Sequence, residues 1–508
     1  MIQHLTFLPV LLPMLAGVIL LMPPFGSNKD YRRITSVVLG TIAFLASLAL
    51  LLKVQADGAQ IYAVGDWSAP FGIVLVADPL STLLVCLTTL LGVVCVLYAS
   101  AGDDEKGSFY HPLVHFLVLG VNGAFLTGDA FNLFVFFEVL LIASYSLLMH
   151  GGDKKNTRAA LHYVILNLVG SAIFLIALGI LYGVLGTLNM ADMADMAQKV
   201  AHLQGDDVYL AKIGGLLLLV VFALKGALLP LHLWLPNTYA TAMPVVAALF
   251  AIMTKVGVYS MMRVYTLIFG DEAGELSHMA QSWLWWLALA TIVMGAVGVL
   301  ASKDLRKLVA NLVIVSVGTL VALVAVQTVE ASSAAIYYLV HSTLVTAALF
   351  ILADLIGRQR GNVADRITPG QPVAQPRLLG TCFLIAAVGV IGMPPLSGFI
   401  SKVWLLKATL NVEYTFVFWP IYLIASLAIL VGVAKAGSTV FWHHQGERIE
   451  MAGQERIHPA QLVALILLIS GAPLMSVFAG PLSEYAVGAA TQLHDFNHNI
   501  KVILLGDQ

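Results

Sequence analysis

Charged side chains are scarce in this sequence. Only 11% of the 508 residues are Asp, Glu, Lys or Arg, whereas 59% are hydrophobic and the mean hydropathy is +0.91. An ordinary soluble domain is roughly 25% charged, so the composition excludes that class and indicates a polytopic helical membrane protein. The net charge of −2 also excludes the basic excess that a nucleic-acid partner requires.

Cysteine is equally scarce. Cys86, Cys95 and Cys382 fall inside apolar segments without CxxC or metal-ligand spacing, so we interpret them as small core residues and expect no metal site. The sequence contains no phosphate-binding loop and no nucleophile with a matching base, so we expect neither a hydrolase nor a cofactor. The N-terminus lacks a basic n-region and a cleavage site, and its apolar run is therefore predicted to be the first span.

Long apolar runs dominate what remains. A membrane-spanning helix needs about 20 residues, and windows of this length predict an all-α fold with about 14 transmembrane helices. The twelfth window is too long for a straight span at ~1.5 Å per residue, which predicts a broken helix. The predicted spans are 4–22, 32–52, 73–98, 109–128, 131–150, 159–185, 211–235, 241–268, 282–301, 306–327, 333–356, 378–409, 416–442 and 458–480.

The loops predict the orientation. Most Lys and Arg residues lie in odd-numbered loops, and the even-numbered loops and the tail hold only Lys53, Lys199, Lys212 and Lys501. Because positive loops stay in the cytoplasm, we expect odd-numbered loops to be cytoplasmic and both termini to face out. We interpret the mildly acidic outer segment 189–207 as a solvated loop.

The seventh span, KIGGLLLLVVFALKGALLPLHLW, places a cation near its middle. Pro230 lacks the N–H that would bond the carbonyl of Gly226, so we expect a helix break with a free acceptor beside Lys225. Such an arrangement is tolerated only inside protein or along a water-filled cavity. We interpret Lys225 as part of an ion-transfer site.

A weak internal repeat connects the seventh and twelfth spans. Span 12 contains GMPPLSGFISK with Gly392, Pro394 and Pro395 before Lys402, which resembles the Gly/Pro-interrupted lysine segment of span 7. Because the two spans lie five apart, they run in opposite directions. We therefore predict two inverted five-helix repeats, spans 4–8 and 9–13, with broken helices at spans 7 and 12. The predicted domains are 1–108, 109–268, 282–442 and 443–508.

Glu138 is the only acid of the fifth span, FNLFVFFEVLLIASYSLL. At ~1.5 Å per residue, counted from the outer edge of each span, Glu138 lies about 12 Å deep in the membrane and Lys225 lies ~20 Å deep. The two residues are either a static buried pair that fixes helix packing or a switch. We favour the switch, because an approaching opposite charge favours the charged form of each group and separation releases the proton.

Three further residues could pass the proton on from Lys225 and so form a relay. Lys255 is midway along span 8, His341 in YYLVHSTLVTAALF has an unperturbed pKa near 6.5 that suits a relay, and Lys402 comes late in an outward-running span. A snorkelling lysine and a hydrogen-bonded core histidine are the structural alternatives. The secondary candidates are His232, His162 and Lys435. We interpret Arg263 and Lys407 as rim anchors, and Asp78 and Asp129 as helix caps.

These blocks resemble the proton-translocating antiporter-like subunits shared by Mrp-type cation/proton antiporters and respiratory complex I. The resemblance is carried by GDAFNLFVFFEVLLIASYSLL, LKGALLPLHLWLPNTYATAMPVVAALFAIMTKVGVY, YYLVHSTLVTAALF and GMPPLSGFISK, and within the family it is greatest to the D-type subunit of Mrp (Mnh, Sha or Pha) antiporters. It implies that Glu138 and Lys225 are the coupled pair, Lys255 and His341 the central relay and Lys402 the terminal group. Family members often carry a second basic residue one turn after the histidine, where this sequence has Val345 and Thr346, so water or a hydroxyl would have to bridge the relay.

The resemblance also implies a hetero-oligomeric complex in the plasma membrane that exchanges Na⁺ or K⁺ for H⁺ without a redox cofactor. Its partners would be other small hydrophobic and antiporter-like subunits. Our main hypothesis is thus a secondary-transporter subunit rather than an enzyme. The alternatives are a proton-pumping subunit of a redox-driven complex and a non-transporting scaffold.

Overall fold

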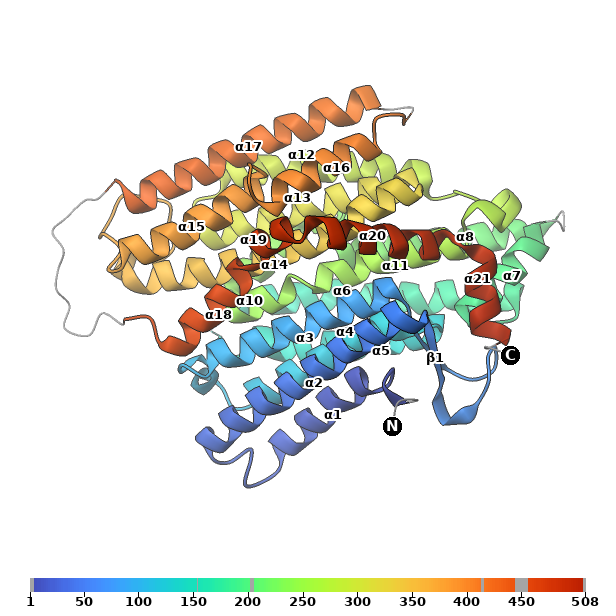
Figure 1. Cartoon of the computed structure of the whole chain (residues 1–508), viewed down its shortest axis with the longest axis horizontal. Coiled ribbons are helices and arrows are strands. Elements are labelled where there is room, and N and C mark those ends of the chain that lie inside the picture. The colour runs from blue at the N-terminus through green and yellow to red at the C-terminus, as the bar shows by residue number, and fades with distance from the viewer. Residues whose placement is uncertain (1–3, 153, 202–204, 413–414, 444–455, 506–508) are drawn as a thin grey trace.

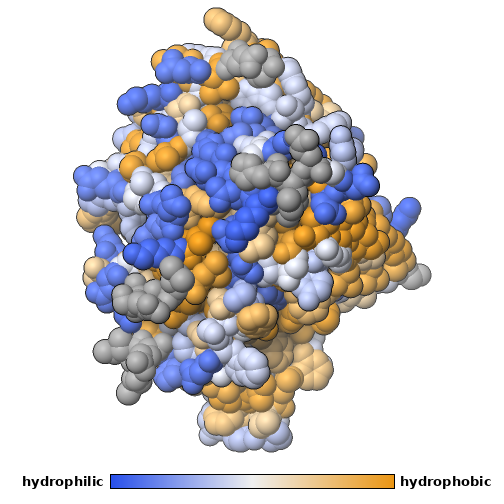
Figure 2. All heavy atoms as spheres, turned by 90° about the vertical axis from the view of Figure 1, so that its right-hand side faces the viewer, coloured by the Kyte–Doolittle hydropathy of each residue, from blue (hydrophilic) through white to orange (hydrophobic). Residues whose placement is uncertain are grey.

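The computed structural model describes residues 4–152, 154–201, 205–412, 415–443 and 456–505. Long helices lie side by side along one direction, and both termini lie at the same end of the bundle (Figure 1). Hydrophilic side chains gather over that end, whereas the flanks visible in the same view are largely hydrophobic (Figure 2). This distribution fits a bundle whose helices cross a bilayer and whose end faces water.

The number of membrane spans agrees with the prediction. Within the described residues, 11 helices are long and apolar enough to cross a membrane, and three shorter apolar helices, α1, α4 and α15, complete the predicted set. The principal helices of the first half are α1 (Leu8–Leu21), α2 (Lys29–Asp57), α3 (Pro79–Ala99), α4 (Tyr110–Leu126), α5 (Ala130–Met149), α6 (Lys154–Leu185), α8 (Asp206–Gly226), α9 (Trp234–Thr241), α10 (Pro244–Phe250) and α11 (Met253–Leu267). Those of the second half are α12 (Gln281–Ala301), α13 (Leu305–Val326), α14 (Val329–Gln359), α15 (Pro376–Ile391), α16 (Ser397–Ala408), α17 (Thr415–Phe441), α18 (Pro459–Ile469), α19 (Gly471–Val477) and α20 (Ala479–His494).

Three local predictions were wrong. The start of the third predicted span is an extended strand, because β1 (Gln60–Ala63) and β2 (Val74–Ala77) pair antiparallel before Asp78 caps α3. The outer segment interpreted as a loop contains α7 (Met190–Ala201). The last helical run continues through α20, well beyond the predicted end at residue 480.

The two halves of the bundle use the same order of neighbours. In the first half α4 packs on α5, α5 on α6 and α6 on α8, and α11 returns to α4. In the second half α12 packs on α13, α13 on α14 and α14 on α15 and α16, and α17 returns to α12. This pattern is what two five-helix units of equal topology produce.

A network of ion pairs holds one end of the bundle together. Asp104, in the turn between α3 and α4, accepts hydrogen bonds from Arg33 of α2 at 2.6 and 2.9 Å and lies 3.2 Å from His111 Nε2. Burial raises the pKa of Asp104, but the hydrogen bonds with His111 and Arg33 outweigh it and hold that pKa well below its ordinary value. Asp103 in the same turn pairs with Arg358 of α14 at 2.5 Å. The N-terminal helices are thereby tied to the second half.

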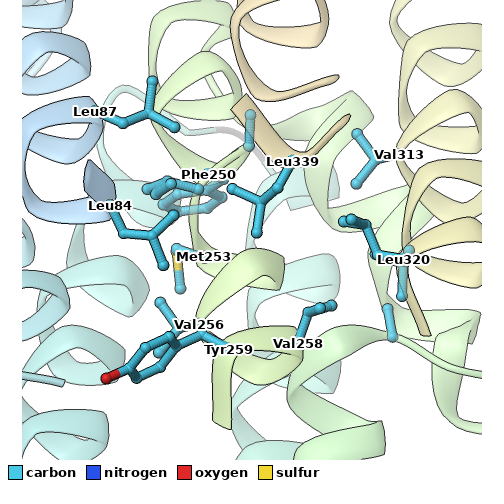
Figure 3. Packing of buried hydrophobic residues seen from close by; sticks show 14 of the residues in the cluster. Leu84, Leu87, Phe250, Met253, Val256, Val258, Tyr259, Val313, Leu320 and Leu339 are labelled. Carbon is cyan, nitrogen blue, oxygen red and sulfur yellow. The ribbon is translucent and has the colours of Figure 1, made fainter. Parts of the chain in front are cut away.

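The interior around α10 and α11 is filled by apolar side chains. They come from α3, α10, α11, α13 and α14 and pack against one another at the centre of the bundle (Figure 3). Those labelled in the view are Leu84, Leu87, Phe250, Met253, Val256, Val258, Tyr259, Val313, Leu320 and Leu339.

Candidate functional site

Glu138 projects from α5 toward α6. It is half-buried, and its Oε1 accepts a hydrogen bond from the Ser171 hydroxyl of α6. Ser171 also donates to the carbonyl of Asn167 at 3.0 Å, one turn earlier on the same helix. The glutamate therefore meets a polar patch on α6.

The break predicted after Lys225 is confirmed. α8 ends at Gly226, Ala227 has a left-handed conformation with φ of 59°, and Leu228 N–H bonds the carbonyl of Ala223 at 2.8 Å. This is the hydrogen-bond pattern that commonly closes a helix C-terminus. Lys225 is thus held in the last turn of a helix that stops inside the membrane region.

Lys225 was predicted to pair with Glu138, but its direct partner in this structure is a neutral side chain. Its Nζ donates to the Asn167 side-chain oxygen at 3.0 Å and lies 5.5 Å from the centre of the Phe137 ring. The side chain is only 6% exposed. An amide oxygen can stabilise the ammonium without fixing it permanently, because the amide carries no charge.

Asn167 and Ser171 lie between Glu138 and Lys225. Within the described residues no ion pair joins Glu138 to Lys225; instead, Glu138 bonds Ser171, and Lys225 bonds Asn167. The two polar residues are one helical turn apart on α6, so both face the same neighbours. The two residues of the predicted pair are thus both hydrogen-bonded to the same face of α6.

Lys255 occupies a closed interior position. It is 0% exposed, and its Nζ donates to the Ser316 hydroxyl of α13 at 3.2 Å. The eighth span, predicted as continuous, is interrupted just before it, between α10 and α11. The amides of Ala251 and Ile252 bond three residues back, which gives a short tight turn ahead of the lysine.

A small cavity extends from Ser316, and apolar side chains form most of its walls. Its volume of about 20 Å³ is room for about one water molecule. The polar residues of its lining are Ser316, Tyr338, His341, Ser342, Thr346, Lys402, Tyr422 and Ser426. The predicted positions Val345 and Thr346 both face this cavity, so a water molecule has space at the point where the second basic residue is missing.

His341 and Lys402 meet at the second break. α15 ends at Ile391 and α16 begins at Ser397, whose hydroxyl lies 2.8 Å from His341 Nδ1. Lys402 Nζ donates to the carbonyl of Ile391 at 2.6 Å and to the Ser426 hydroxyl of α17 at 2.8 Å. This lysine satisfies a backbone carbonyl that the break has freed.

The secondary candidates are placed apart from these contacts. His232 is buried in the turn after α8, and its Nδ1 has no hydrogen-bond partner in the described part of the chain. His162 and Lys435 are exposed on α6 and α17, and Lys407 is exposed on α16. These candidate residues therefore divide into a buried one at a helix break, His232, and exposed ones on the outer faces of the bundle.

The interpretation of Arg263 as a rim anchor was wrong. Its guanidinium is 8% exposed and forms a buried ion pair with Asp78, which also caps α3 through Ser81 N–H at 2.8 Å. The cap predicted at Asp129 is present, since it accepts the Asn132 N–H at 2.7 Å.

The candidate residues form two polar groups, and the two groups are adjacent where α8 and α11 pack closely together. Glu138 and Lys225 form one group with α6, whereas Lys255, His341 and Lys402 form the other around the cavity. A Cβ added at Gly257 would lie 2.6 Å from the Gly226 nitrogen, so α11 and α8 touch through backbone between Lys225 and Lys255. The Thr254 hydroxyl beside this contact is buried and lacks a partner among the described residues.

Sequence reasoning missed the uncharged members of the site. These are Asn167, Ser171, Ser316, Tyr338 and Ser426. Asn167 and Ser171 carried a usable signal, because polar residues four apart in an apolar window share one helix face. No group of three His, Cys, Asp or Glu side chains suited to a metal ion occurs in the described residues.

Comparison with known proteins gives consistent likenesses. Residues 127–429 match the family model described as NADH:quinone oxidoreductase/Mrp antiporter, TM. The chain is 36% identical to the D-type subunit of a probable K(+)/H(+) antiporter of Rhizobium meliloti, covering 97% of this chain and 96% of the relative. It is 37% identical to the D-type subunit of a Na(+)/H(+) antiporter of Bacillus subtilis, covering 92% and 94%.

Solved structures give the same picture. A chain of the Mrp complex from a Dietzia species superposes with a TM-score of 0.88 at 26% identity, covering 99% of both chains. A chain of respiratory complex I from Thermus thermophilus superposes with a TM-score of 0.80 at 25% identity, covering 97% of this chain and 99% of that chain.

Proposed function

Because the chain belongs to the NADH:quinone oxidoreductase/Mrp antiporter family, we propose that it is a subunit of a multisubunit antiporter that exchanges Na⁺ or K⁺ for H⁺. Its relatives are named as the D-type subunits of such antiporters. We propose further antiporter-like and small hydrophobic subunits as its partners. The driving force is an ion gradient, so the protein is a secondary transporter and no chemical reaction is catalysed.

Protons move along Glu138, Lys225, Lys255, His341 and Lys402. The observation that supports this route best is the cavity shared by Ser316, His341 and Lys402, because Lys255 donates to Ser316 at its edge. Buried ionisable groups at membrane depth are costly and commonly mark ion pathways. The hydroxyl groups, together with a water molecule for which the cavity has room, would supply the hydrogen bonds that a proton needs to pass.

The switch lies between Glu138 and Lys225. Asn167 holds the Lys225 ammonium as a neutral acceptor, and Ser171 holds the Glu138 carboxylate. When the carboxylate approaches the ammonium, Lys225 keeps its proton; when it withdraws, burial favours the neutral amine and the proton moves on. Cation movement takes place elsewhere in the complex or at a shared interface.

The domain boundaries and orientation complete the proposal. We assign 1–108 to an N-terminal segment, 109–268 and 282–442 to the two repeats and 443–508 to the C-terminal part, of which 444–455 and 506–508 lie outside the described residues. We place the protein in the plasma membrane with both termini outside the cytoplasm, since most basic loop residues are on the opposite side.

The test is antiport in inverted vesicles of the intact complex, with Na⁺ and K⁺ supplied separately. Glu138→Ala and Lys225→Ala should each abolish cation-dependent proton movement while the complex still assembles. Lys407→Ala, an exposed lysine on α16, is the control and should retain normal exchange. Normal exchange by either of the first two variants would show that this pair is not the coupling site.

A second candidate is a proton-pumping subunit of a redox-driven complex, favoured by the likeness to complex I. Purification distinguishes the two. Companion subunits with iron–sulfur or flavin centres and quinone-dependent pumping would favour the redox complex, whereas small hydrophobic companions without such centres would favour the antiporter.

A further inference from the structure

The short helix α9 contacts both of the breaks that carry a relay lysine in the first half of the bundle. It begins at Trp234, directly after the break that follows Lys225, and two residues separate its end from α10, which leads to Lys255. It packs on α6 and α13, the helices that supply Asn167 to Lys225 and Ser316 to Lys255. One element thus contacts the helices that bind both lysines.

Trp234 attaches α9 to the first break. Its indole N–H donates to the carbonyl of Leu224 at 3.1 Å, the residue before Lys225. Its ring lies 5.0 Å from the ring of Tyr163, whose own carbonyl accepts the side-chain amide of Asn167. Trp234 therefore touches the last turn of α8 and the segment of α6 that binds the lysine.

Tyr239 attaches α9 to the second break. Its hydroxyl donates to the carbonyl of Phe250 at 2.7 Å, and the side chain is only 1% exposed. In a continuous helix this carbonyl would accept the N–H of Thr254, four residues on. A side chain that enters the hydrogen-bond ladder is a recognised cause of a kink, and here it lies one turn before Lys255.

The kink determines the direction of Lys255. Ala251 and Ile252 bond three residues back, and a turn of three residues rotates each residue by about 120° instead of about 100°. Over two residues the difference is about 40°, enough to turn the lysine away from Ser316 if the helix became regular. The hydrogen bond of the Tyr239 hydroxyl thus lies at the turn whose geometry orients Lys255 toward Ser316.

We propose that Trp234 and Tyr239 are positioning residues, and that α9 is a clamp whose two buried hydrogen bonds fix the Lys225 and Lys255 breaks relative to each other. The proposal rests on the proposed function, since the clamp aligns the two lysines between which the proton passes. The aromatic rings of the clamp lie 6.0 Å apart on one short helix, and under this proposal a shift at one break moves the other through that helix. Neither residue itself exchanges a proton.

The test uses Trp234→Phe, Tyr239→Phe and the double variant in the intact complex. Each change removes one hydrogen-bond donor and keeps an aromatic ring. Tyr265→Phe is the matched control, because that buried tyrosine on α11 also donates to a carbonyl, Gly215, at 2.7 Å, but at no break. Trp419→Phe is the control for the indole, which bonds Thr409.

The single variants should assemble normally, lose roughly tenfold or more in antiport rate and shift the pH of half-maximal rate, since a misplacement of ~1 Å can cost on the order of 100-fold. Hydrogen exchange at Thr254 should slow in Tyr239→Phe, because the Phe250 carbonyl becomes free to accept its amide. The double variant should be no slower than the slower single variant, as expected for residues that act as one unit. Both controls should keep the normal pH profile.

The proposal is overturned if Tyr239→Phe has the rate and pH profile of Tyr265→Phe, or if the losses of the two single variants multiply in the double. Lys225→Ala measured in parallel separates this result from a failure of the proposed function. An inactive Lys225→Ala with a normal Tyr239→Phe rejects the clamp alone, whereas normal exchange in Lys225→Ala rejects the proton route itself.

Discussion

Lys402 donates a hydrogen bond to the carbonyl of Ile391 at 2.6 Å, across the break that separates α15 from α16. The lysine thus has two tasks, since it satisfies backbone polar groups at membrane depth and it borders the cavity that contains His341. An unsatisfied carbonyl in such surroundings is costly. Under the proposed proton route, a change at this side chain would affect both the break and transport.

Replacing Lys402 with Leu should abolish antiport and also lower the thermal stability of the complex in detergent. The lost hydrogen bond leaves the Ile391 carbonyl without its donor, at a cost of about 1–3 kcal/mol. Lys407→Leu, an exposed lysine further along α16, should change neither property. An active Lys402→Leu complex would show that the terminal group lies elsewhere.

Asn167→Ala should reduce antiport to near background without affecting assembly. It removes the oxygen that holds the Lys225 ammonium at 3.0 Å and leaves a buried cation unpaired. Asn122→Ala is the control, because that buried amide on α4 donates to the carbonyl of Pro9 and touches none of the relay residues. Antiport rates of both variants are measured in vesicles. Equal rates in the two would contradict the proposal that Asn167 of α6 supports Lys225 in proton transfer.

Gly257→Ala should weaken both stability and exchange. The added Cβ would lie 2.6 Å from the Gly226 nitrogen and 3.0 Å from the Lys225 carbonyl carbon, so α11 must move away from α8 at a cost of about 1–3 kcal/mol. Gly183→Ala on α6 has open space at the same position and should be neutral or slightly stabilising. Thermal unfolding and antiport rates of the two variants test whether the lysines depend on this contact.

Asp78→Asn should destabilise the protein much more than it slows exchange. It leaves Arg263 as a buried charge without its carboxylate partner, which costs about 3–5 kcal/mol. The exposed pair Lys199–Asp195 provides the comparison, and Asp195→Asn should have almost no effect. We expect a lower thermal transition temperature with a normal antiport rate per assembled complex. An Asp78→Asn complex that is fully stable but inactive would instead place the Asp78–Arg263 pair on the ion route.

The sequence was sufficient for the spans and for the breaks caused by local residues. The break after Lys225 and the one before Lys402 follow from glycine and proline in the segments themselves. The interruption between α10 and α11 could not be predicted in this way, because the segment LFAI contains neither residue. The hydroxyl that bonds the Phe250 carbonyl there belongs to Tyr239, on another helix.

Partners that are distant in the chain were likewise inaccessible. Asp78 and Arg263 lie 185 residues apart, and each alone resembles a common surface role. α7 could have been found, since Met190, Met193, Ala194 and Ala197 are buried at helical spacing. Its acidic residues led to the loop interpretation instead. The uncharged site residues were missed because Ser and Asn are also common at helix contacts in membranes.

The apolar packing around Lys255 has a consequence for the cell. A permanently wet row of side chains through the bundle would let hydrogen ions run down their gradient and waste it as heat. The cavity beside Ser316 has room for about one water molecule, and apolar side chains from five helices fill the interior around α10 and α11 (Figure 3). Such packing opposes a standing leak, and the proposed proton route would conduct only while water briefly entered this region during the exchange cycle.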